Sequence, residues 1–170
     1  MKFRQFLRKS FQFNRSLLSH KTNNILPDIE SSQSVSIHIR RGDYLQGDNI
    51  NVFVNLCASS YYKNAIHYIE ENINNPSFFV FSNDIDWVKN NMDIPNATFV
   101  SWNKKEDSWQ DMFLMSMCKH NIIANSSFSW WGAWLNNNED KIIIALSRFL
   151  TTCENNDLIP KEWITLEYES

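Results

Sequence analysis

Short apolar segments alternate with amphipathic segments along most of this 170-residue chain, and this alternation constrains its fold more than any other feature. Val35, Ile37 and Ile39 alternate with polar residues, which is the periodicity of a strand. Further strands are expected at 78–81, 97–102, 122–124 and 141–146, and helices at 59–73, around Trp87, at 107–118 and at 128–135. Repeated strand–helix alternation predicts an α/β fold, a Rossmann-like parallel sheet with helices on both faces.

The composition excludes several classes of protein. A hydrophobic fraction of 43% with 21% charged residues is typical of a globular domain. The net charge of −3 argues against nucleic-acid binding, so an anionic ligand would need a local cluster of positive charge. The three cysteines, Cys57, Cys118 and Cys153, are widely spaced and lack a CxxC pattern, which favours a reduced, cytoplasmic location.

The N-terminal region, 1–33, is expected to be helical or linker-like, with a loosely polar connector over 20–34, and 34–170 to form the ligand-binding domain. Four apolar residues near the start have helical spacing and basic neighbours: Phe3, Phe6, Leu7 and Phe11. We favour a helix packed on the domain, and a basic helix on a membrane surface is the alternative. No apolar run approaches the ~20 residues needed to span a bilayer.

Polar residues follow the predicted strands at the edge where open α/β sheets bind ligands. The first strand runs into Arg40-Arg41-Gly42-Asp43, and a later one into Asn125-Ser126-Ser127 at the start of a helix. Arginine donates two hydrogen bonds to a phosphate at once, and a helix N-terminus attracts anions. Solvated arginines and an ordinary serine N-cap would explain each motif alone, but their convergence predicts a phosphate site.

Asp111 lies near the start of the helix expected at 107–118. Its charge would stabilise the first helical turn, which is one interpretation. The other is recognition of guanine, whose ring N–H and exocyclic amine can donate side by side to one carboxylate. Asp84 and Asp86 form a D-x-D pair that some enzymes use to bind metal, but the pattern is common and no metal is expected here.

Three segments together resemble glycosyltransferase family 11, the α-1,2-fucosyltransferases. They are SVSIHIRRGDYL at 34–45, FVFSNDIDWVK at 79–89 and DMFLMSMCKHNIIANSSFSWWGAWLN at 111–136. The resemblance extends over nearly everything from Ser34 onward. It implies a GT-B-like fold with the donor in the C-terminal half. It also implies transfer of L-fucose from GDP-β-L-fucose to a galactose hydroxyl of a glycan, with inversion and without an obligatory metal.

The resemblance also implies roles for particular residues. Arg40 should bind the β-phosphate of GDP, helped by His38 and Arg41, while Asp111 contacts guanine. Phosphate oxygens would be bound by Asn125, Ser126 and Ser127, and the nucleotide or fucose side lined by Asn83 and Asp84. Asp43 would brace the arginine loop or touch the donor. Arg40, His38 and Asp43 are the candidate catalytic residues, the last two because inversion normally requires a general base.

One departure from the family pattern concerns the N-terminal side. The family has a glycine-rich G-G-L-G-N-Q-type segment in a half that contributes to acceptor binding, and only 33 residues precede Ser34 here without such a segment. The chain is therefore expected to be the donor-binding half, truncated or completed by another polypeptide. The alternatives are a GDP-sugar-binding module without turnover and, ranked last, a carbohydrate-binding domain that uses Trp130, Trp131 and Trp134.

Overall fold

The computed structural model describes residues 6–8, 10–42, 55–58, 60–150 and 157–167. Within this part of the chain, six parallel strands form one sheet in the order β3-β2-β1-β4-β5-β6. The strands are β1 (Gln33–Ile39), β2 (Pro76–Ser82), β3 (Ala97–Val100), β4 (His120–Ile122), β5 (Ile143–Leu146) and β6 (Ile164–Leu166). The predicted α/β, Rossmann-like architecture is confirmed.

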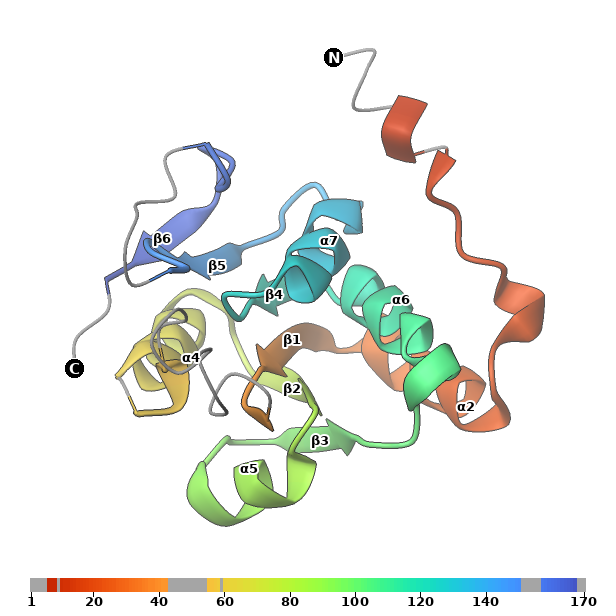
Figure 1. The fold of residues 1–170 in the computed structure, drawn as a ribbon, viewed down its shortest axis with the longest axis horizontal. Coiled ribbons are helices and arrows are strands. Elements are labelled where there is room, and N and C mark those ends of the chain that lie inside the picture. The colour runs from red at the N-terminus through yellow and green to blue at the C-terminus, as the bar shows by residue number, and fades with distance from the viewer. Residues whose placement is uncertain (1–5, 9, 43–54, 59, 151–156, 168–170) are drawn as a thin grey trace.

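Helices cover both faces of the sheet, as Figure 1 shows. One face carries α2 (His20–Ser31), α6 (Trp109–Met117) and α7 (Ser127–Leu135), and the other carries α4 (Tyr61–Asn72) and α5 (Ile85–Asn91). Three short 3-10 turns complete the described elements: η1 (Arg15–Leu17), η3 (Leu56–Ala58) and η4 (Lys105–Asp107). This two-sided covering is what buries a parallel sheet on both faces.

The strand order reverses at β1, which pairs with β2 on one side and with β4 on the other. Ile37 lies opposite Val80 of β2 and Ile122 of β4. The chain therefore leaves β1 toward one edge of the sheet and later returns to build the other. In open parallel sheets this reversal opens a crevice outside the carboxyl ends of the two central strands, where ligands bind.

The central strand β1 has one apolar and one polar face, although both are buried. Val35, Ile37 and Ile39 belong to the larger apolar core. On the opposite face, Asn121 of β4 donates hydrogen bonds to Ser36 Oγ at 2.7 Å and to the Met115 carbonyl oxygen of α6 at 2.7 Å. Because buried polar groups must be satisfied, this contact fixes α6 over β1 and β4.

The expectation of a polar connector over 20–34 is wrong, because most of this segment forms α2. Ser19 caps this helix by accepting a hydrogen bond from the Thr22 N–H, and Thr22, Ile25 and Ile29 are buried. The spacing of these three residues is helical, but Pro27 inside the helix masks the signal because proline is normally excluded from helix interiors. The helix packs against β1 and α6. The predicted domain boundary between residues 33 and 34 stays a prediction.

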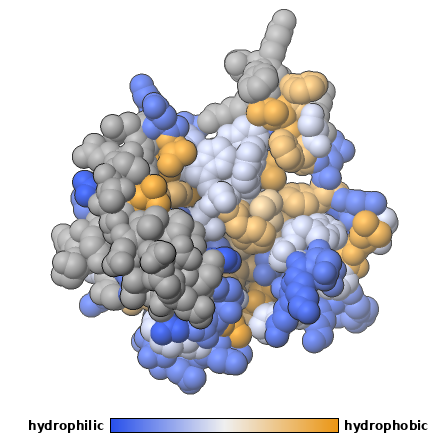
Figure 2. Space-filling view, in the orientation of Figure 1, coloured by the Kyte–Doolittle hydropathy of each residue, from blue (hydrophilic) through white to orange (hydrophobic). Residues whose placement is uncertain are grey.

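The N-terminal segment before α2 is only partly buried. Leu7 packs against the larger core, whereas Phe6 and Phe11 are 65% and 49% exposed. Figure 2 shows apolar surface around this segment, at the upper right. Phe3 lies outside the described residues. Among the described helices, none has the length and apolarity required to traverse a lipid bilayer.

The C-terminal part adds the strand β6, which pairs with β5 and was not among the strands expected from the sequence. Three residues are too few to show a period of two, so this strand has little local signal in the sequence. Trp163, just before it, is buried and packs against Trp130 of α7 at 5.6 Å between ring centroids. Trp134 is buried as well, so these tryptophans form a core cluster.

Candidate functional site

A cleft of about 910 Å³ lies at the carboxyl edge of the sheet, where the strand order reverses. Residues from the ends of β1, β2, β3 and β4 contribute to it. Among the predicted site residues, those that line it are His38, Arg40, Asn83, Asp84, Asp111, Ser126 and Ser127. The cleft therefore brings together side chains that are up to 89 positions apart in the sequence, from His38 to Ser127.

Arg40 and the N-terminus of α7 line the same cleft. Arg40 is half-buried directly after β1, and Ser126 is the N-cap of α7. The Ser126 side chain makes no capping hydrogen bond to the N–H groups of the first turn. A guanidinium and a helix N-terminus both attract anions, and together they create a local positive potential in a chain of negative net charge.

His38 is a buried, neutral histidine at the base of this cleft. Burial, and secondarily the positive charge of Arg40, lower the pKa of His38 to about 3. Among the described residues its Nδ1 has no hydrogen-bond partner, and its ring lies 5.7 Å from that of Phe128. A neutral imidazole can exchange a hydrogen bond with a ligand, but such a low pKa makes it a weak proton acceptor.

Asp111 lies on the first turn of α6 and faces the cleft. Asn103, in the loop after β3, donates a hydrogen bond from Nδ2 to Asp111 Oδ1 at 2.8 Å. Burial raises the pKa of Asp111 to about 7, and the hydrogen bond from Asn103 opposes this rise. The carboxyl group is thus close to half-ionised at neutral pH. A ligand that donates hydrogen bonds to it would lower its pKa and favour the anion.

Two predicted site residues have side chains directed elsewhere. The Arg41 guanidinium bonds Asp84 Oδ2 at 2.6 Å and stacks over the Trp87 ring at 4.2 Å. Asn125 donates from Nδ2 to the Phe149 carbonyl oxygen at 3.0 Å. Neither residue is among those that line the cleft. Asp43, the third candidate catalytic residue, lies outside the described residues.

Gly42 allows the arginine loop to approach the end of β2. The Arg41 N–H donates to Asn83 Oδ1 at 3.0 Å, and a Cβ at Gly42 would lie 2.5 Å from Asn83 Nδ2. We expect Gly42→Ala to displace the Asn83 amide and to lose this bond, which lowers the unfolding free energy by about 1 kcal/mol. Chemical denaturation measures this, and an unchanged unfolding free energy would show that the loop tolerates the methyl group.

Sequence reasoning assigned no site role to several residues that line the cleft, although Asn103 was recognised as the end of a predicted strand. Asn103, Lys104, Lys105 and Ser108 all follow β3, and Phe128 belongs to α7. Lys105 has a positive φ of 53°, a left-handed conformation that costs energy for a residue with a side chain. The signal was available, because these residues follow a predicted strand in the same way as Arg40 does. Which of their side chains line the cleft could be known only from the structure.

Asp84 and Asp86 both line the cleft. Within the described ranges, no group of three or more histidine, cysteine, aspartate or glutamate side chains is arranged to hold a metal ion. Asp84 forms an ion pair with Arg41. That the reaction needs no metal stays a prediction.

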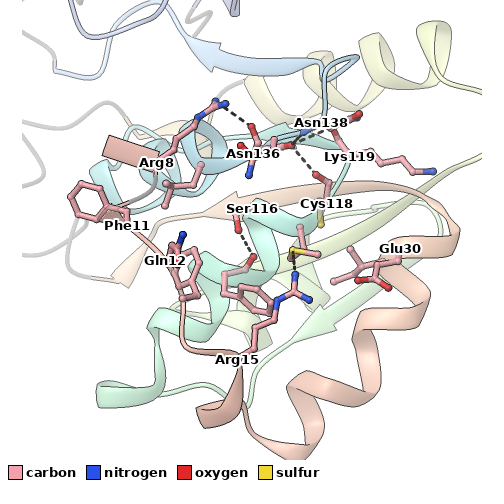
Figure 3. Close-up of a pocket in the computed structure, with 16 residues that line it drawn as sticks. Arg8, Phe11, Gln12, Arg15, Glu30, Ser116, Cys118, Lys119, Asn136 and Asn138 are labelled. Atoms are coloured by element: carbon pink, nitrogen blue, oxygen red, sulfur yellow. Dashed lines mark hydrogen bonds between the residues drawn. The ribbon is translucent and has the colours of Figure 1, made fainter. Parts of the chain in front are cut away.

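A second cavity of about 570 Å³ lies at the opposite edge of the sheet, near the segments that lead into β1, β4 and β5. Figure 3 shows Arg8 directed toward Asn136, just after α7, whose carbonyl oxygen accepts a hydrogen bond from it at 3.4 Å. Arg8 also donates to the Trp134 carbonyl oxygen at the C-terminal end of α7, at 2.9 Å. Arg15 bonds Met117 Sδ at the end of α6. These cations interact with the negative ends of two helices, and none of the predicted site residues lines this cavity.

A family model described as glycosyl transferase family 11 matches residues 1–167. The O-antigen biosynthesis glycosyltransferase WbnK of Escherichia coli is 40% identical over 162 residues, 92% of this chain and 53% of the relative. An alpha-1,2-colitosyltransferase of the same organism is 42% identical over 146 residues, 82% of this chain and 49% of the relative.

A more distant relative is galactoside alpha-(1,2)-fucosyltransferase 1 of Homo sapiens, 32% identical over 103 residues, which are 59% of this chain and 28% of that protein. The chain thus spans about half the length of the bacterial relatives that it matches. The match of the family model along nearly the whole chain shows that the protein belongs to glycosyl transferase family 11.

Proposed function

We propose that this chain binds GDP-fucose in the cleft at the carboxyl edge of the sheet and forms the donor-binding part of an inverting α-1,2-fucosyltransferase. The acceptor is a galactose hydroxyl of a glycan. The observation that carries the proposal is the convergence of Arg40 and the N-terminus of α7 on one cleft at the reversal of strand order. The names of the relatives, which include a glycosyltransferase of O-antigen biosynthesis and galactoside fucosyltransferases, support this class of reaction.

In this proposal the diphosphate lies between Arg40 and the first turn of α7. Arg40 donates two hydrogen bonds from its planar guanidinium, and the hydroxyls of Ser126 and Ser127 add donors beside the N–H groups of the helix. His38 is neutral at physiological pH because of its lowered pKa, so it assists as a hydrogen-bond partner and not as a cation. Neutral His38 close to Arg40 also avoids repulsion between two positive groups.

Guanine lies at the other end of the cleft, against Asp111. The ionised carboxylate accepts from the ring N–H and the exocyclic amine of the base, a pair that adenine and uracil do not offer in the same arrangement. Asn83 and Asp84 also line the cleft, and in this proposal they border the nucleotide or the fucose. We assign to Arg41 the bracing of Asp84 and Trp87, since its guanidinium is engaged with both.

The chemical step breaks the bond between the anomeric carbon of fucose and the β-phosphate oxygen and forms a bond from that carbon to the acceptor oxygen. Negative charge develops on the departing GDP, and the proton of the acceptor hydroxyl passes to a general base. Asp43 is the remaining sequence candidate for this base, because the low pKa of His38 makes it a weak proton acceptor. Arg40 and the N-terminus of α7 stabilise the departing charge electrostatically. Because these groups supply positive charge at the diphosphate, the proposal includes no metal ion.

The proposal is tested by titrating GDP-fucose, GDP and ADP into the full chain by calorimetry, combined with a transfer assay on a galactoside. We expect GDP-fucose and GDP to bind with at least about tenfold preference over ADP, the equivalent of one charge-assisted hydrogen bond. The absence of GDP binding would contradict the proposal. One relative is named a colitosyltransferase, so the same titration and transfer assay should also be run with a nucleotide donor that carries colitose.

A second candidate is a GDP-sugar-binding module that does not turn over. The observation in its favour is that the chain spans about half the length of its bacterial relatives. The same experiment separates the two candidates, because binding of GDP-fucose without transfer or hydrolysis supports the module. Peripheral membrane association through the basic N-terminal segment stays a prediction from the sequence.

A further inference from the structure

We propose that Thr22 of α2 and Asn103 after β3 are positioning residues that determine base selectivity, because they orient the carboxylate of Asp111 toward the nucleobase. This inference rests on the proposed binding of a guanine nucleotide in the cleft. It assigns a role in donor recognition to α2, a helix that precedes the arginine motif and does not itself line the cleft.

The three residues form a continuous chain of hydrogen bonds. Asn103 Nδ2 donates to Asp111 Oδ1 at 2.8 Å, and Thr22 Oγ1 donates to Asn103 Oδ1 at 3.2 Å. Thr22 is fully buried, Asn103 is 9% exposed, and Asp111 borders the cleft. The chain therefore runs from the interior beneath α2 to the wall of the cleft.

The chemistry of the groups fixes the direction of these bonds. In the ionised state that would bind guanine, the Asp111 carboxylate only accepts, so Asn103 presents its NH₂ group to Asp111 and its carbonyl oxygen to Thr22. Thr22 then uses its single proton on Asn103. Thr22 Oγ1 also accepts two hydrogen bonds, from Trp102 Nε1 at 3.2 Å and from Ser19 Oγ at 3.0 Å. A reversed amide at Asn103 would place an oxygen against the carboxylate.

The consequence for recognition is geometric. With Oδ1 held by Asn103, the carboxylate of Asp111 cannot rotate freely, and the plane in which both oxygens accept is set before a ligand arrives. Guanine needs that plane to match its two parallel donors, and inosine, which lacks the exocyclic amine, needs only one acceptor. Preorganisation of this kind increases selectivity more than it increases the affinity for the diphosphate, which other residues bind.

The test compares the affinities of GDP and inosine diphosphate (IDP) in the full chain and in three variants. We expect the parent to bind GDP at least about tenfold more tightly than IDP. In Thr22→Val, which removes the hydroxyl at nearly constant volume, this ratio should fall at least threefold while the affinity for IDP changes less than twofold. Thr22→Ser should retain the parental ratio, and Thr165→Val on the exposed part of β6 is the matched control.

Each outcome decides between the hypotheses. A parental ratio in Thr22→Val overturns the inference and leaves the proposed function intact, and an equal loss of GDP and IDP affinity also overturns it because the effect is then general. A parent that binds neither nucleotide refutes the proposed function and the inference with it. Should Thr22→Val fail to fold, Asn103→Ala at the wall of the cleft replaces it, with the same loss of ratio expected.

Discussion

Replacing Arg40 with lysine is expected to weaken GDP binding at least about tenfold, which corresponds to one lost hydrogen bond between charged groups. Lysine retains the positive charge but cannot donate two parallel hydrogen bonds from a planar group. The loss therefore reports the geometry of the contact and not the charge alone. Calorimetric titration of GDP into the folded variant measures it, and the unfolding midpoint should change little because Arg40 is only half-buried.

The neighbouring Arg41 offers a matched control for this experiment. Its guanidinium bonds Asp84 and stacks on Trp87, so Arg41→Lys should lower the unfolding free energy by about 1 kcal/mol and change the GDP dissociation constant less than threefold. A reversed pattern, with strong loss of GDP in Arg41→Lys and little in Arg40→Lys, would show that the second arginine contacts the diphosphate.

Asp111→Asn is expected to stabilise the ligand-free protein at alkaline pH and at the same time to abolish the preference for guanine. The pKa of Asp111 is raised from 3.8 to about 7 in the folded protein, chiefly by burial. A raised pKa means that this group favours the folded state most below about pH 4. That contribution is lost as the pH rises through 7, at a cost of up to about 4 kcal/mol once the group is ionised in both states.

Asparagine has the shape of the carboxyl group and carries no charge, so the variant avoids this cost. We expect its unfolding free energy to exceed that of the parent at pH 8 and to match it near pH 4, measured by denaturant unfolding at both values. The variant should bind GDP and ADP with similar affinity, because the amide cannot accept two hydrogen bonds side by side. A variant that keeps the parental preference for GDP would remove Asp111 from base recognition.

Much of the fold could be predicted because its elements carry strong local signals. The alternation in β1 and the apolar run of β2 identified the central strands, and the parallel arrangement followed from the helices between them. The two elements that were missed had weak local signals. In α2, Pro27 contradicts an otherwise helical spacing, and β6 has only three residues.

The sequence could predict which residues lie at the edge of the sheet that carries the site, but not where their side chains point. The sequence located Arg40, Asp111 and Ser126 at one edge of the sheet, because carboxyl ends of parallel strands share an edge. It did not indicate which of two adjacent arginines faces the cleft, since that depends on Asp84 and Trp87 as partners of the other. The contact between Thr22 and Asn103 joins residues 81 positions apart, and no local pattern encodes such a bond.

The most direct test of the account is a crystal structure of the chain with GDP bound. We predict the β-phosphate within hydrogen-bond distance of the Arg40 guanidinium and of N–H groups in the first turn of α7, with guanine against Asp111. A diphosphate bound in the second cavity, between Arg8, Arg15 and Lys119 at the opposite edge of the sheet, would contradict it.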